Sequence, residues 1–235
     1  MLFRSTGVLE ASGYREAEYF LAGTATSYVA PGSLTEDGDW TVAPGPTAPY
    51  RTRIIVRRPE DPAKFSGTVV VEWMNVTAGR DSDPEYGYLY PMLMREGDAY
   101  VGVSAQQIGV EGGGGLEVPG VPPEALLALK QWDPQRYRDL RHPGDAWSYD
   151  IFSQAAQAVV APGSVDPLDG LRPRTLIAAG QSQSAGTLAT YWNAVQPITE
   201  MFDGFLLDGR GRFGGGLADG TGTNAVPRVV RLRPA

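Results

Sequence analysis

Ser182 stands where a buried strand gives way to a helix, a setting in which a serine hydroxyl can act as a nucleophile. The stretch "LIAAGQSQSAG" (176–186) is apolar up to Gly180 and rich in small residues after it. A serine on a tight strand-to-helix turn projects its hydroxyl above the sheet, beside helical N–H groups that can donate to an oxyanion. Gly180 and Ser184 provide the small neighbours that such a turn requires. The pattern predicts acyl transfer through Ser182.

Two other serines fit parts of this pattern. Ser184 would be the nucleophile in the frame 182–186, but the apolar strand "TLIAA" ends one residue too early for that frame. Ser104 follows Gly102 at the same spacing, yet "QQIGVEGGGG" comes soon after it and cannot turn straight into a helix. The stretch 180–186 could also be a small-residue helix start that only packs on the sheet.

The elements around these serines alternate between strand and helix. Buried or β-branched runs predict strands, and residues at helical spacing predict helices. From residue 67 the order is β-α-β-α-β-α-β, which indicates a mostly parallel sheet with helices on both faces, after an antiparallel N-terminal meander. The predicted strands are 17–29, 50–59, 67–75, 98–106, 174–180 and 201–209; the predicted helices are 83–97, 145–160 and 182–195, with a loop over 107–144 that holds one short helix near 123–132.

Five blocks of this sequence resemble an α/β-hydrolase domain family that is largely uncharacterised. They occur in the same order and with compatible spacing, and the resemblance covers most of 15–210. It implies the α/β-hydrolase fold, hydrolysis of esters or related acyl compounds, and a small-molecule substrate. The blocks are "VVVEWMNVTAGRD", "REGDAYVGVSAQQIGVEGG", "LRHPGDAWSYDIFSQA", "AAGQSQSAGTLATYWNAVQP" and "FDGFLLDGR".

The resemblance also implies an oxyanion hole made by two backbone N–H groups. One belongs to the loop after the strand "TVVVEW", near Asn75 and Val76, and the other to Gln183, directly after the nucleophile. The loop reads "WMNVTAG", whereas lipases usually have His-Gly there, so the correspondence is approximate. Asn75 could equally be a turn former at the end of its strand.

The partners of a serine triad are not evident in this chain. The family order is serine, acid and then histidine, but the single histidine, His142, precedes Ser182. It lies on a predicted loop, where it could fix the Pro143–Gly144 turn, which we favour, or take a catalytic or substrate-contacting role. Asp208 ends a strand at an edge where some members of the fold carry the acid, and it could also be a turn residue. The other acids after Ser182 are Glu200, Asp203 and Asp219, and the only lysines are Lys64 and Lys130.

Three hypotheses follow from the missing partners. The chain could be the N-terminal part of a longer serine hydrolase, a catalytically dead relative that binds a ligand, or an enzyme with an unconventional base. We favour the first, because a sheet that ends after its sixth strand leaves an apolar edge uncovered. We therefore expect one α/β-hydrolase domain over 1–235, irregular over 209–235 and cut off before the acid and the histidine. Alone, it should turn over little substrate.

Composition narrows the remaining function classes. The absence of cysteine excludes disulfides and thiol catalysis, and with one histidine and no calcium-loop pattern in "DSD" (81–83) we predict neither a metal nor a cofactor. The four glycines at 112–115 lack a P-loop setting, and the Arg/Gly stretch 209–216 is short. A net charge of -7 argues against nucleic acid or an anionic membrane as partner. Without a signal peptide or a membrane-spanning run, the sequence indicates a cytoplasmic protein.

Overall fold

The computed structural model contains one six-stranded sheet. It describes residues 6–32, 34–35, 37–116, 119–211 and 214–217. The strands lie in the order β1-β2-β4-β3-β5-β6. Their bounds are β1 Tyr14–Val29, β2 Ala43–Pro59, β3 Thr68–Trp73, β4 Ala99–Val103, β5 Thr175–Gln181 and β6 Gly204–Asp208.

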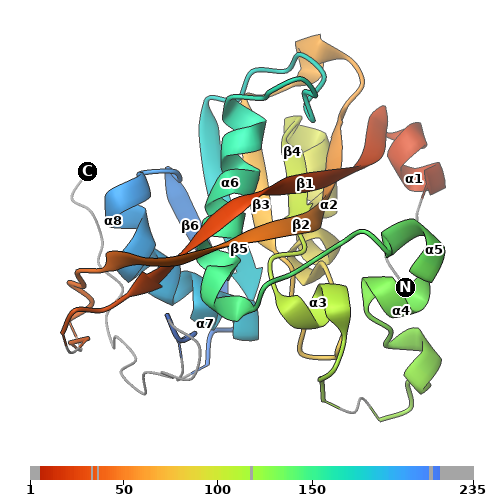
Figure 1. Ribbon diagram of the computed structural model, residues 1–235. Coiled ribbons are helices and arrows are strands. Elements are labelled where there is room, and N and C mark those ends of the chain that lie inside the picture. The colour runs from red at the N-terminus through yellow and green to blue at the C-terminus, as the bar shows by residue number, and fades with distance from the viewer. Residues whose placement is uncertain (1–5, 33, 36, 117–118, 212–213, 218–235) are drawn as a thin grey trace.

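The first two strands differ from the rest in direction and length. β1 and β2 form a long antiparallel ribbon that runs across the molecule in Figure 1, and β2 also pairs antiparallel with β4. The β3–β4, β3–β5 and β5–β6 pairs are parallel. The prediction of a mostly parallel sheet after an antiparallel beginning is therefore confirmed, although both ribbon strands extend well beyond the ranges 17–29 and 50–59.

Helices cover both faces of the sheet, as the alternation of elements predicted. One face packs Val69, Val71 and Trp73 of β3 against α6 (Ser148–Val160) and α7 (Gln183–Thr190). The other packs Val70 and Tyr100 against α1 (Thr6–Ala11) and α2 (Pro84–Glu96). Every residue of β4 and five of the six residues of β3 are buried, because these central strands are covered on both sides.

The segment predicted as a loop with one short helix holds four short helical pieces instead. They are α3 (Gln107–Glu111), η2 (Pro123–Ala125), α4 (Leu129–Trp132) and α5 (Pro134–Tyr137). Each has five residues or fewer, which is too short to show a helical period in the sequence. The helices α3, α4 and α5 pack around a small core of their own, formed by Val110, Leu129, Tyr137 and Leu140.

Helix α1 was not predicted, and the strand predicted over 98–106 is shorter, Ala99–Val103. Further differences concern the helices and their ends. The helix predicted over 182–195 is α7, followed by a π-helical turn η4 (Tyr191–Val195) and by α8 (Gln196–Thr199). The helix predicted over 145–160 begins with the 3-10 turn η3 (Asp145–Trp147), and a further 3-10 turn, η1 (Pro62–Lys64), precedes β3.

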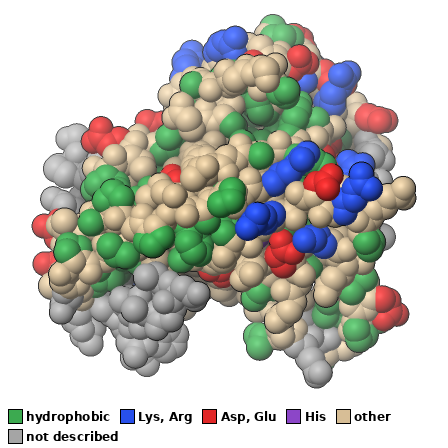
Figure 2. Space-filling model, in the orientation of Figure 1, with side chains coloured by type: hydrophobic (Ala, Val, Ile, Leu, Met, Phe, Trp, Pro, Cys, Tyr) green, Lys and Arg blue, Asp and Glu red, His purple; other side chains and the backbone are tan. Residues whose placement is uncertain are grey.

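On the face drawn in Figure 2, acidic and basic side chains lie intermingled beside a region rich in hydrophobic side chains.

Candidate active site

Ser182 occupies a strained turn between β5 and α7. Its φ of 57° and ψ of -113° fall in a region that residues with a side chain rarely adopt. The turn is held by backbone bonds: the Ser182 N–H donates to the Asp208 carbonyl at 2.9 Å, and the Gly186 N–H donates to the Ser182 carbonyl at 3.1 Å. The Ser182 side chain is half-buried and makes no capping bond to the helix. Its hydroxyl therefore stands beside the unpaired N–H groups at the start of α7.

Close packing explains the glycine two positions before Ser182. A Cβ at Gly180 would lie 2.9 Å from Leu188 Cδ1 and 3.1 Å from Ser184 Cβ, so only glycine lets α7 approach β5 this closely. Ser184 itself is fully buried, and its hydroxyl has no hydrogen-bond partner among the described residues. Of the two serines in the motif, Ser182 lines the cavity described below, and Ser184 is not among the described residues that line it.

The cavity beside Ser182 has a volume of about 720 Å³. Its described walls come from the ends of β3, β4 and β5 and from the glycine-rich segment after β6. This is the edge where the carboxyl ends of parallel strands meet, the usual place for ligands in such sheets. The lining residues are Val76, Thr77, Gln106, Ile108, Gly115, Leu116, Asp145, Ser182, Gln183, Thr187, Gly211, Gly214 and Gly215.

The structure changes the expected oxyanion donor in the loop after β3. The Asn75 N–H donates to the Ser82 carbonyl at 2.9 Å, so it is not free to bind an oxyanion. The Asn75 side chain instead ties the loop to the nucleophile turn, because Nδ2 donates to the Gln181 carbonyl at 2.9 Å. Val76 lines the cavity, and its N–H has no acceptor in the part of the chain that the structure describes. Val76 replaces Asn75 as the candidate donor, and Gln183 keeps its place at the cavity wall.

Asp208 meets Ser182 through its backbone and not through its carboxylate. Gly180 faces α7, so the next residue, Gln181, and the Asp208 paired with it face the opposite side of the sheet, where α2 lies. There the Asp208 charge, added to burial, raises the pKa of Glu85 to about 6. Asp208 is not among the cavity-lining residues.

The other acids after Ser182 do not reach the cavity walls that the structure describes. The Asp203 carboxylate accepts from the Leu176 N–H at 2.8 Å, near the opposite end of β5. Glu200 ends α8 in a left-handed conformation. Asp219 lies outside the described residues.

His142 is buried behind the cavity wall, with both ring nitrogens engaged. Nε2 lies 2.8 Å from the Ala105 carbonyl, and Nδ1 accepts from the Gly144 N–H at 3.3 Å, a contact that fits the predicted role at the Pro143–Gly144 turn. Burial lowers the pKa of His142, so the ring is held neutral. The lysines are also elsewhere: Lys130 pairs with Glu111 at 2.7 Å, and Lys64 lies exposed in η1.

Asp145 is a cavity residue that the sequence did not reveal. It is the first residue of the helix predicted over 145–160, and its carboxylate accepts from the Gln107 N–H at 2.8 Å, 38 positions away. A longer contact of 3.3 Å joins it to Gln106 Nε2. Its position just after a long loop and before a helix was the only signal that could have suggested a place at this edge.

Two features are absent from the part of the chain that the structure describes. No group of three or more His, Cys, Asp or Glu side chains is arranged to hold a metal ion among these residues. No helix there is long and apolar enough to span a bilayer.

Solved structures that are similar to this chain align with it at low sequence identity. Esterase Est22 aligns at 13% identity with a TM-score of 0.43, over 86% of this chain and 46% of its own, so the chain spans less than half of that esterase. Oligopeptidase B from Trypanosoma brucei with bound antipain aligns at 14% identity and a TM-score of 0.39, over 83% of this chain and 21% of its own. No curated protein matches. The alpha/beta hydrolase domain family matches residues 1–234, and the chain therefore belongs to that family.

Proposed function

We propose that the protein is a serine hydrolase that cleaves carboxylic esters through an acyl-Ser182 intermediate. One observation carries the proposal: Ser182 combines a strained backbone, a helix N-terminus and a place on the cavity wall. Packing does not require a serine at this position. Backbone strain at such a residue is typical of functional positions. The family is consistent with a hydrolase, and the ester as substrate is our inference.

The nucleophile and the oxyanion donors of the reaction lie at the cavity. Ser182 Oγ attacks the ester carbonyl carbon, its proton passes to a base, and the carbonyl oxygen takes up negative charge. The N–H groups of Val76 and Gln183 are the donors for that oxygen. Collapse of the intermediate releases the alcohol and leaves the acyl group on Ser182, and water then hydrolyses the acyl-enzyme.

The base is the part of this scheme that the described residues do not supply. His142 is buried with both nitrogens engaged, and Asp208 faces α2. Without a base beside it, a serine hydroxyl is a weak nucleophile. We therefore expect the 235-residue chain to react with strong electrophiles but to turn over simple esters slowly. The competing proposal is a catalytically silent relative that binds a ligand in this cavity, and the same lack of a base favours it.

A fluorophosphonate probe tests the assignment of Ser182. The probe should label the wild-type chain and should not label Ser182→Ala. Ser184→Ala is the matched control within the same motif, and it should still be labelled because Ser184 is buried. Equal labelling of wild type and Ser182→Ala would refute the nucleophile. An unlabelled wild type that binds short-chain esters would support the silent relative.

A further inference from the structure

The loop between β3 and α2 forms one wall of the cavity and contains the candidate oxyanion donor. Val76 and Thr77 line the cavity. The loop is closed at its base by two hydrogen bonds between Asn75 and Ser82, each 2.9 Å long. The position of Val76 relative to Ser182 therefore depends on what fixes residues 74–82 as a unit.

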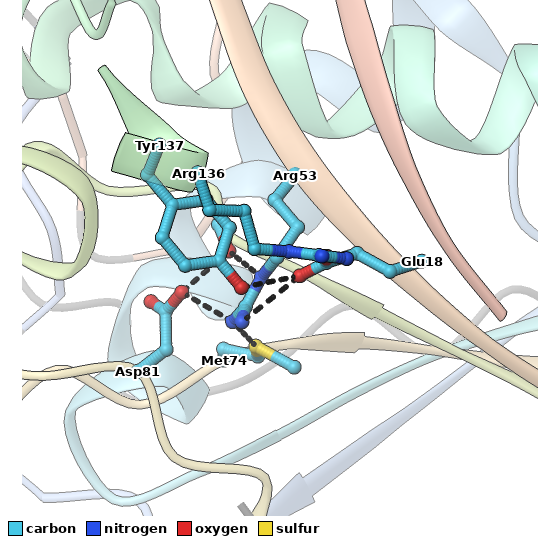
Figure 3. Close-up of polar contacts among 7 residues, drawn as sticks. Glu18, Arg53, Met74, Asp81, Arg136 and Tyr137 are labelled. Carbon is cyan, nitrogen blue, oxygen red and sulfur yellow. Dashed lines mark hydrogen bonds and ion pairs between the residues drawn. The ribbon is translucent and has the colours of Figure 1, made fainter. Parts of the chain in front are cut away.

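A single guanidinium contacts both ends of this loop. Arg53 extends from β2, and its side chain is fully buried. Its Nη2 donates to Asp81 Oδ2 at 2.8 Å, near the end of the loop, and lies 3.6 Å from Met74 Sδ, at the start of the loop. Figure 3 shows the guanidinium between these two side chains. Arg53 thus fixes the two ends of the loop relative to each other.

The same ion pair also reaches the other walls of the cavity. The Ser104 hydroxyl, just after β4, donates to Asp81 Oδ2 and accepts from Arg53 Nε at 3.1 Å. The free carboxylate oxygen of Asp81 occupies the place where a Cβ of Gly109 would lie, so α3 packs directly on Asp81. Ile108, the neighbour of Gly109, lines the cavity.

An outer layer holds the guanidinium in place. Arg53 Nη1 lies 3.7 Å from Glu18 Oε1. The Tyr137 hydroxyl donates to the same Glu18 oxygen at 2.7 Å, and Arg136 pairs with the other oxygen of that carboxylate (Figure 3). The orientation of Arg53 is therefore set from β1 and α5 as well as from the loop.

We propose that Arg53 and Asp81 are positioning residues that set the Val76 N–H against Ser182. A buried ion pair adds little net stability over an apolar pair of similar volume, whereas its directional bonds fix the groups it joins. Here those bonds join the loop to β2 and to the end of β4, and α3 packs against Asp81. The inference rests on the proposed function, because the Val76 N–H is the oxyanion donor of the proposed reaction.

The double variant Arg53→Met/Asp81→Val tests this role. It removes both charges together, so no unpaired charge remains buried, and its stability should fall only by the loss of the two hydrogen bonds of the buried Ser104 hydroxyl. The maximal rate of fluorophosphonate labelling at Ser182 should fall on the order of tenfold, because the oxyanion donor is displaced. The probe concentration for half-maximal rate should change much less, since the cavity itself remains.

Two further variants separate positioning from general structure. Asp81→Asn keeps the acceptor for Arg53 and should keep the labelling rate within about threefold. Arg58→Met/Asp169→Asn removes another ion pair of β2, with an N–O distance of 2.6 Å, that takes no part in the loop. It should leave labelling unchanged. A wild-type maximal rate in Arg53→Met/Asp81→Val would overturn the proposal.

Hydrogen exchange of residues 74–83 gives a measurement that does not depend on Ser182 chemistry. The double variant should lose protection at the Asn75 and Ser82 amides while β4 and β5 keep theirs. If wild type is not labelled at all, the proposed function fails, and unchanged exchange in the variant would separately refute the anchoring of the loop. Should the double variant not fold, Arg53→Lys decides, because lysine keeps the charge but cannot contact Asp81, Met74 and Ser104 together. A wild-type rate in Arg53→Lys would overturn the proposal.

Discussion

Ser104 and Ser182 occupy equivalent places on two strands and differ in almost every property that matters for reactivity. Each follows a glycine at a spacing of two, and their strands, β4 and β5, flank β3. Ser104 is fully buried, and its hydroxyl is hydrogen-bonded to both Arg53 and Asp81. Ser182 is half-buried, has a positive φ and lines the cavity.

The difference shows that the residues after the serine decide its role. Behind Ser182 the chain turns at once into α7, and Gly180 is needed because the helix backbone lies against it. Behind Ser104 two residues, Ala105 and Gln106, separate the serine from the short helix α3, and Gly102 is crowded by side chains, chiefly the end of Met74. A hydroxyl with two buried partners contributes to packing, whereas a hydroxyl on a strained turn beside a cavity is available for chemistry.

The largest predicted effect is the pH dependence of the free energy of unfolding. It tests whether the region of Ser104 on β4 and the region of Ser182 on β5 unfold as one cooperative unit. Glu72 lies on β3, between the two serine-bearing strands, and burial raises its pKa from the ordinary 4.5 to about 8. The folded protein then holds this proton more tightly than the unfolded chain. The stabilisation is complete below pH 4.5 and is lost as the pH rises through about 8, at up to about 1.4 kcal/mol per pH unit.

Urea unfolding between pH 5 and pH 8 measures this loss, and Glu72→Gln, which does not titrate, should flatten it. Hydrogen exchange on β4 and β5 should show both regions weakening together. If only one strand loses protection, β4 and β5 open separately, and the two serines do not belong to one cooperative unit.

A second prediction concerns alanine substitutions of the glycine that lies two positions before each serine. Gly180→Ala should lower the free energy of unfolding by about 3 kcal/mol, since the new methyl group meets Leu188 and the start of α7. Gly102→Ala should cost about 1 kcal/mol, because the end of the Met74 side chain can move aside. Thermal or urea unfolding of both variants measures the difference. Equal costs would mean that α7 does not press on β5 as described.

The smallest predicted effects have opposite signs at the two serines. Ser182→Gly should raise the free energy of unfolding by about 1 kcal/mol, because glycine relieves the strain at φ 57°. Ser104→Gly should lower it by about 2 kcal/mol, since Arg53 and Asp81 lose a buried partner. The measurement is the same unfolding assay, with Ser→Ala at each site as the reference. A loss of stability in Ser182→Gly would contradict the strain.

The sequence predicted those parts of the molecule that depend on neighbours in the chain. The buried runs, the helix after Ser182 and the alternation from residue 67 are local patterns, and all appear in the structure. The face to which Asp208 points depends on its register with Gln181, and the use of the Asn75 N–H depends on a bridge to Ser82. Neither pairing has a signature in the sequence.

The burial of the charged Arg53 and Asp81 side chains was also not predictable from the sequence. Arginine is normally a surface residue, and the stretch "YRTRIIVRRP" gave no reason to treat Arg53 differently from Arg51. Their environments are opposite: Arg53 is fully buried, and Arg51 is exposed. The partner that makes burial possible, Asp81, lies 28 positions further along the chain.

The bond from the Ser182 N–H to the Asp208 carbonyl has a consequence for the order of assembly during synthesis. A chain leaves the ribosome from its N-terminus, so Ser182, Gly180 and all of α7 emerge before β6 does. A nascent chain that has reached residue 200 already contains the serine but lacks the strand that holds its amide. The turn is therefore completed only after β6 has emerged and paired with β5.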